Sequence, residues 1–242
     1  MAARVMTRPL AVAHAGGAGH GPENTLLAIS RALALGAHAI EVDVRLTSDQ
    51  LPVLMHDATV DRTTDGHGPI SSLAWDDVRS LNTGEGEKVP SLAEAAKLVA
   101  GRALLIAELK VAGGAHAIAQ ALIPTVGPEG AQVWSFLPQA LEELAQVAPS
   151  FPRTLLVSGR DVQQWPCPLQ TALRLEAIGI AIEHTALEGD IAQDVKRAGL
   201  ELFAWTIDEP EEIARALDLG VDGIVSNYPD RVLALVGQHR GR

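Results

Sequence analysis

The sequence contains very little cysteine and few aromatic residues. Cys167 is the only cysteine among 242 residues, and aromatic residues make up 3% of the chain. A single thiol excludes an intramolecular disulfide and any zinc site that needs paired thiolates. Cys167 lies in a WPCP context that predicts a loop, and we do not expect it to act as a catalytic nucleophile.

Long apolar runs and a basic charge balance are also missing. No window offers the roughly 18 consecutive apolar residues that a membrane-spanning helix requires. The stretch 1–10 has no apolar segment typical of a signal peptide, so the sequence predicts a cytoplasmic protein without stable membrane association. The formal net charge of −11 and the lack of Lys/Arg runs argue against a nucleic-acid partner.

The chain does contain many short runs rich in Val, Ile and Leu, separated by amphipathic stretches. This alternation is typical of a parallel sheet whose strands are connected by helices, and the length suits one (β/α)₈ TIM barrel domain over residues 1–242. Strands are expected at 10–14, 38–44, 103–108, 131–135, 153–157, 178–182, 200–205 and 222–226. Helices are expected, for example, at 24–35, 91–99, 138–147, 188–198, 209–218 and 229–236. The stretch 47–90 breaks the rhythm and is interpreted as an insertion after the second strand.

Two carboxylates lie on one side of the second predicted strand. In IEVDV, Glu41 and Asp43 are two residues apart, so both point to the same face. Burying them together is costly unless a cation is bound, because adjacent carboxylates cannot both stay ionised in a low dielectric. A hard divalent cation is one interpretation, and salt bridges to neighbouring strands are the other.

Glu108 and Lys110 repeat this spacing at the end of the third predicted strand. Glu108 is a candidate third oxygen ligand, and Lys110 a candidate contact to phosphate. Two alternatives stay open for the lysine, which are a Schiff-base role and a simple ion pair with Glu108 on the rim.

Two histidines are candidate proton donors or acceptors at strand ends. His14 ends the first predicted strand and precedes a loop of small residues, while His56 follows the apolar run LPVLM. Phosphodiester cleavage near neutral pH needs one group to deprotonate the attacking oxygen and one to protonate the leaving oxygen. Each histidine alone could equally be a packing or surface residue. Trp205, at the end of the seventh strand, is either a pocket wall or a packing residue.

These residues lie in segments that resemble the glycerophosphodiester phosphodiesterases, in that family's order and over nearly the whole chain. The shorter segments are VPSLAEA, AELK, VWSF, FAWTID and GVDGIVSNYPD. The long one is HAGGAGHGPENTLLAISRALALGAHAIEVDVRLTSDQLPVLMHDATVDRTTDGHG. A His-Gly loop, PENT, E-x-D and HD followed by RTT-x-G-x-G form a specific combination.

The resemblance implies a TIM barrel that hydrolyses glycerophosphodiesters to glycerol 3-phosphate and an alcohol with Ca²⁺ or Mg²⁺. By this resemblance Glu41, Asp43 and Glu108 are expected to bind the metal, and His14 and His56 to act as the acid/base pair. Lys110 would contact the phosphate. The insertion would cover the glycerol end of a small-molecule phosphodiester, and Asn24 of PENT would orient the loop, reach the metal or start a helix. A homo-oligomer is left open.

The chain departs from the family pattern at two positions. The family usually has Arg directly after the first His, where this chain has Ala15, and Asn is frequent where this chain has Asp208. Loss of a charged contact to phosphate would cost about 1.5–3 kcal/mol if nothing replaces it. Two alternatives therefore accompany the enzyme hypothesis, which are a catalytically impaired binding protein and a phospholipase D-like enzyme with another substrate.

Overall fold

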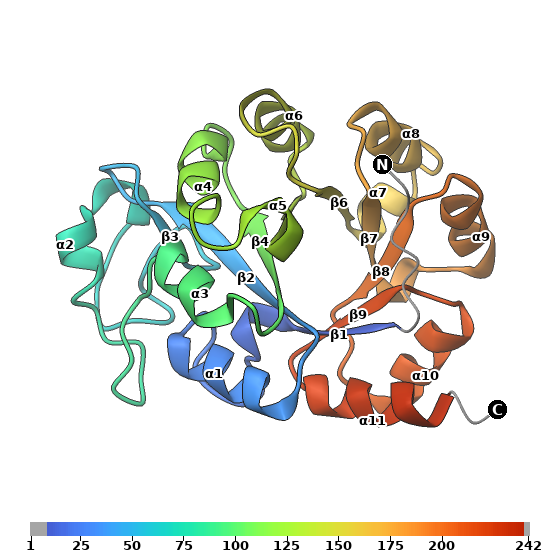
Figure 1. The fold of residues 1–242 in the computed structure, drawn as a ribbon, viewed down its shortest axis with the longest axis horizontal. Coiled ribbons are helices and arrows are strands. Elements are labelled where there is room, and N and C mark those ends of the chain that lie inside the picture. The colour runs from blue at the N-terminus through green and yellow to red at the C-terminus, as the bar shows by residue number, and fades with distance from the viewer. Residues whose placement is uncertain (1–8, 240–242) are drawn as a thin grey trace.

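Eight parallel strands form a closed barrel in the structure, a computed structural model that describes residues 9–239 (Figure 1). Around the barrel the order is β1, β2, β4, β5, β6, β7, β8 and β9, and β1 pairs with both β2 and β9. The strands are β1 Leu10–Ala13, β2 Ala39–Leu46, β4 Leu104–Leu109, β5 Ala131–Ser135, β6 Arg153–Val157, β7 Gly179–Glu183, β8 Glu201–Trp205 and β9 Gly223–Ser226. The predicted TIM barrel is confirmed, and each predicted strand end lies within two residues of the observed one.

Helices surround the barrel on its outer side (Figure 1). They are α1 Leu26–Leu35, α2 Trp75–Val78, α3 Leu92–Val99, α4 Ala115–Leu122, α5 Gly127–Gly130, α6 Pro138–Val147, α7 Gly159–Val162, α8 Cys167–Arg174, α9 Gly189–Arg197, α10 Pro210–Asp218 and α11 Pro229–His239, with short 3-10 turns at η1 His14–Gly16, η2 Ile70–Ser72 and η3 His184–Ala186. The loop predicted around Cys167 is wrong at that residue, because Cys167 begins α8. Within residues 9–239 no helix has both the length and the apolar character needed to cross a bilayer.

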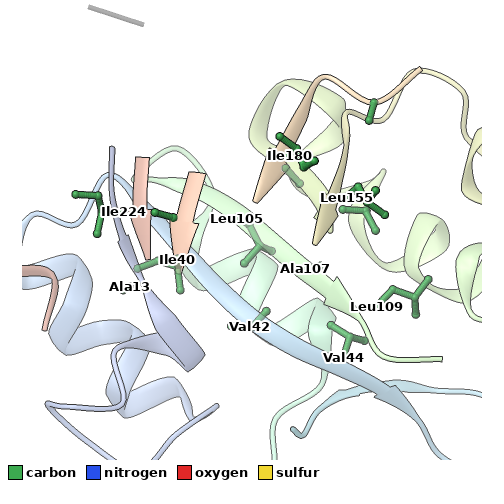
Figure 2. Close-up of a cluster of buried hydrophobic side chains, with 14 of the residues drawn as sticks. Ala13, Ile40, Val42, Val44, Leu105, Ala107, Leu109, Leu155, Ile180 and Ile224 are labelled. Carbon is green, nitrogen blue, oxygen red and sulfur yellow. The ribbon is translucent and has the colours of Figure 1, made fainter. Parts of the chain in front are cut away.

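Alternate side chains of each strand pack outward against these helices. Ile40, Val42 and Val44 of β2 are fully buried in this layer, beside Leu105 and Leu109 of β4 (Figure 2). The core between barrel and helices is therefore built from the period-two pattern of the strands.

The helix ends also follow the local sequence, since Ser91 and Glu94 form the capping box at the start of α3.

The opposite side chains fill the barrel interior. One buried residue from each strand of the barrel forms this second cluster, which consists of Val12, Ala39, Ile106, Trp134, Leu156, Ala181, Phe203 and Val225. The interior is thus an apolar plug rather than a channel. Any inward-pointing residue nearer the carboxyl ends of the strands lies on top of that plug.

The segment after β2 forms a small layer beside the barrel. Its strand β3, Pro52–Leu54, runs antiparallel to β2. Its apolar side chains bury one another in a separate cluster, which consists of Val53, Met55, Val60, Ile70, Val78 and Val89. This packing holds the residues that follow β3 next to the carboxyl end of β2.

Candidate active site

The predicted site residues gather around one cavity at the carboxyl ends of the strands. Six of the seven, His14, Glu41, His56, Glu108, Lys110 and Trp205, line a cavity of about 230 Å³. His14, Glu41 and Glu108 each follow an interior plug residue by two positions, so strand alternation aims them into the same space. Asp43 is fully buried and lies opposite Glu108 in the register of β2 and β4.

Three carboxylates and one ammonium group cluster at this cavity, and all of them except Asp43 line it. Oxygens of Glu41, Asp43 and Glu108 lie within 4.8 Å of one another. Lys110 Nζ contacts Asp43 Oδ1 at 2.9 Å and Glu108 Oε1 at 2.8 Å. The ion pair considered from the sequence is therefore present, but it bridges two strands and does not reach Glu41.

The balance of charge differs among these groups. Burial raises the pKa of Glu41 well above its ordinary value, and the charges of Asp43 and Glu108 raise it further. Burial also raises the pKa of Glu108, against the attraction of Lys110. For Asp43 burial acts in the same direction, but Lys110 and Asn24 outweigh it and lower the pKa. Negative charge is thus well compensated at Asp43 and poorly compensated at Glu41.

The donor set fits a hard cation. Glu41 Oε2 accepts the backbone N–H of Ala15 at 2.9 Å, while Glu41 Oε1 is buried and has no hydrogen-bond partner among residues 9–239. A buried carboxylate oxygen without a partner is costly unless a cation binds it. Since all three nearby ligand groups are carboxylates, Ca²⁺ and Mg²⁺ suit this site better than metals that prefer nitrogen or sulfur.

Asn24 holds Asp43 in place. Its Nδ2 donates to Asp43 Oδ2 at 2.8 Å, and its Oδ1 accepts the Asp43 backbone N–H at 3.0 Å. Asn24 has a left-handed φ of 58°, which asparagine tolerates better than most residues. Of the roles expected for Asn24, starting a helix is wrong, because Thr25 is the N-cap of α1.

His56 is oriented by a chain of ionic contacts at the cavity rim. Its Nδ1 lies 2.8 Å from Asp57 Oδ1. Arg62 Nε donates to Asp57 Oδ2 at 2.6 Å, and both Arg62 terminal nitrogens donate to the Glu23 carboxylate. The hydrogen bonds from Arg62 and His56 lower the pKa of Asp57. The PENT loop and the loop after β3 are thereby joined through one guanidinium.

His14 is oriented by residues after the last two strands. Its Nδ1 lies 2.8 Å from Asn227 Oδ1, and Asn227 Nδ2 donates to Asp208 Oδ2 at 2.7 Å. Gly19 lets the ring of Tyr228, the residue after Asn227, pack against the loop that follows His14, because a Cβ at Gly19 would lie 2.4 Å from that ring. Sequence reasoning did not identify Asn227, although its place just beyond a strand end was a usable signal.

Aromatic side chains form the other wall of the cavity. Trp205 Nε1 donates to the carbonyl of Ala181 at 3.0 Å, and its ring lies edge-on to Phe136 with centroids 5.3 Å apart. Trp134 is buried in the plug below and also borders the cavity. Phe136 was not predicted, but it continues the inward-facing register of Trp134 by two residues.

Comparison with known proteins gives a consistent family. The model of the Glycerophosphoryl diester phosphodiesterase family matches residues 14–231. A glycerophosphodiester phosphodiesterase of Caldanaerobacter subterraneus subsp. tengcongensis is 32% identical over 95% of this chain and 98% of that protein. The solved structure of an Oleispira antarctica phosphodiesterase, in complex with the product sn-glycerol-3-phosphate, superposes with a TM-score of 0.88 at 27% identity, covering 95% of this chain and 97% of the other. The solved structure of a glycerophosphodiester phosphodiesterase from Agrobacterium tumefaciens superposes with a TM-score of 0.79 at 28% identity, covering 91% of this chain and 97% of the other.

Proposed function

The chain belongs to the glycerophosphoryl diester phosphodiesterase family, and from that premise we propose that it hydrolyses glycerophosphodiesters to glycerol 3-phosphate and an alcohol with the help of a divalent cation. One observation carries the proposal. Glu41 and Glu108, two of the three clustered carboxylates, line one cavity with two histidines whose Nδ1 atoms are bonded elsewhere.

In this proposal the two imidazoles exchange protons with the substrate. Because Asn227 and Asp57 occupy the Nδ1 atoms, Nε2 is left as the working nitrogen of each ring. The Asp57 carboxylate offsets positive charge on the His56 ring, whereas Asn227 is neutral. We therefore assign removal of the proton from the attacking oxygen to His14 and protonation of the leaving alcohol to His56.

Glu41, Asp43 and Glu108 would hold the cation, which when bound supplies electrostatic stabilisation to the phosphate oxygens. Ca²⁺ and Mg²⁺ both suit these ligands, and we propose one of the two. Lys110 adds a fixed positive charge on the phosphate side. The aromatic wall with Trp205 shields the substrate from water on the other side. A cytoplasmic location, expected from the sequence, stays a prediction.

Ala15 contributes its backbone but no charge to this arrangement. Its N–H orients Glu41, and its side chain is 3% exposed. Phosphate binding in this chain would then depend on the cation and on Lys110. We expect a higher KM for glycerophosphodiesters than in relatives with Arg at this position.

The test is release of glycerol 3-phosphate from glycerophosphocholine and glycerophosphoethanolamine. Activity should disappear with EDTA, return with Mg²⁺ or Ca²⁺, and be lost in Glu41→Ala and His14→Ala. Glu129→Ala and His116→Ala change exposed residues of the same types on helices and should retain activity. Folded protein that releases no product from any diester with any metal would refute the proposal.

A further inference from the structure

We infer that Asp208 is a positioning residue that determines, through Asn227, which nitrogen of His14 carries the proton. The three residues follow three neighbouring strands of the barrel, which are β8, β9 and β1. Their side chains form a continuous chain of hydrogen bonds that ends at the cavity.

Three hydrogen-bond donors contact the Asp208 carboxylate. Its Oδ1 accepts the backbone N–H of Asn227 and the hydroxyl of Ser226, both at 2.9 Å, and its Oδ2 accepts Asn227 Nδ2 at 2.7 Å. A carboxylate offers acceptors and no donor, so only the NH₂ end of the Asn227 amide can face it favourably. The orientation of the Asn227 side chain is thereby determined by its neighbour.

The orientation of the Asn227 amide determines which group faces His14. With its NH₂ turned to Asp208, Asn227 presents Oδ1 to His14 Nδ1 at 2.8 Å. An amide oxygen can only accept, so His14 must carry its proton on Nδ1. The neutral ring then offers an Nε2 lone pair to the cavity, as a proton acceptor requires.

An asparagine at position 208 would change this arrangement. An amide at that position would keep its oxygen on the backbone N–H of Asn227 and turn its NH₂ to the Asn227 side chain. The Asn227 amide would then turn over and present its own NH₂ to His14 Nδ1, so His14 would carry its proton on Nε2. The catalytic consequence rests on the proposed function, since it assumes that His14 takes a proton from the attacking oxygen. The tautomer itself does not depend on that assumption.

Two variants test this chain of hydrogen bonds from Asp208 through Asn227 to His14. Asp208→Asn should allow the Asn227 amide to turn, and the double variant Asp208→Asn with Asn227→Asp should restore a fixed arrangement. In the double variant the new carboxylate at 227 accepts from both His14 Nδ1 and the new amide at 208. Asp218→Asn makes the same chemical change at an exposed residue of α10 and serves as the control.

The primary readout is ¹⁵N NMR of histidine-labelled protein, with His14 assigned by its loss in His14→Gln. The wild type and the control should show protonated Nδ1 and unprotonated Nε2, Asp208→Asn the reverse, and the double variant the wild-type pattern. With glycerophosphocholine, kcat should fall on the order of tenfold or more in Asp208→Asn and recover in the double variant, because an imidazole in the wrong tautomer can lose up to about 10⁴-fold.

A wild-type His14 protonated on Nε2, or an Asp208→Asn spectrum identical to wild type, would overturn the inference. A merely structural role for Asp208 would lower the melting temperature without moving the His14 resonances, and this outcome also overturns it. If no diester is hydrolysed, the proposed function fails, while the NMR spectra still decide whether Asp208 determines the tautomer of His14.

Discussion

At the scale of single residues, Glu41 is the carboxylate whose charge is least compensated. Burial and the neighbouring carboxylates raise its pKa above the ordinary 4.5. At pH values between the unfolded-state and the folded-state pKa, Glu41 of the metal-free folded protein therefore holds a proton that the unfolded chain has lost. The stability that Glu41 contributes is therefore full below pH about 4.5 and is lost as the pH rises through its folded-state pKa.

We predict that stabilisation by Mg²⁺ or Ca²⁺ increases with pH, because cation binding must displace this proton. The measurement is the rise in melting temperature on adding cation, taken across a series of pH values. Glu41→Gln removes this titrating group and leaves only Glu108 with a raised pKa, so its rise should be smaller and should depend less on pH. A cation effect in the wild type that is the same at every pH would contradict the prediction.

Lys110 is the second residue with a specific expectation. Lys110→Met keeps most of the buried aliphatic length but removes the charge that pairs with Asp43 and Glu108. We expect kcat/KM to fall on the order of 10²-fold, since one electrostatic contact to the reacting group is lost. Lys97→Met, at an exposed position of α3, is the control. Borohydride trapping of a carbonyl compound on Lys110 would favour the Schiff-base alternative instead.

At the scale of elements, the period of the strands predicted where most of the candidate residues lie. Because inward residues recur every second position, LLIAELK and IEVDV were enough to place Glu108 and Glu41 on one face. The barrel closure then brought His14 to them. Contacts between distant loops were not predictable, because nothing local pairs Arg62 with Glu23 or Asn227 with His14. Asn24 shows the same limit, since the local sequence fits a helix start as well as a contact to Asp43, which is 19 residues away along the chain.

The two loops joined by Arg62 provide a test at this scale. Arg62→Ala should lower kcat by about 10- to 100-fold, because Asp57 and His56 lose their fixed geometry, and Arg62→Lys should recover only part of it since a lysine cannot form both paired contacts. Substrate KM should change less than kcat. Arg79→Ala, which breaks an exposed contact on α2, is the matched control. Equal kcat in Arg62→Ala and the control would exclude a positioning role.

At the scale of the whole molecule, the barrel face holds a second cavity of about 230 Å³ beside the first. The two share Phe136 and Leu156, and the second extends along Pro138, Leu155 and Pro168. Its walls combine these apolar side chains with the polar side chains of Asp161, Gln164 and Thr171. The alcohol half of a substrate held in the first cavity would have this surface within reach.

We expect kcat/KM to rise for each methylene that contacts the apolar part of the second cavity, by at most about fourfold each. The measurement is a series of glycerophosphodiesters of straight-chain alcohols. Thr171→Trp places an indole in the cavity from α8 and should flatten the series without affecting the shortest substrate. A wild type that is indifferent to chain length would show that the second cavity takes no part in binding.

The closure of the barrel also orders events in time. His14 follows the first strand, yet its hydrogen-bond partner Asn227 follows the last, and β9 completes the sheet by pairing with β1. On the ribosome, His14 therefore emerges more than two hundred residues before the side chain that orients it. The carboxylates of β2 and β4 are also synthesised well ahead of that partner. A nascent or prematurely released chain that stops before residue 227 thus carries these carboxylates without the partner of His14, and under the proposed function we expect it to hydrolyse no substrate.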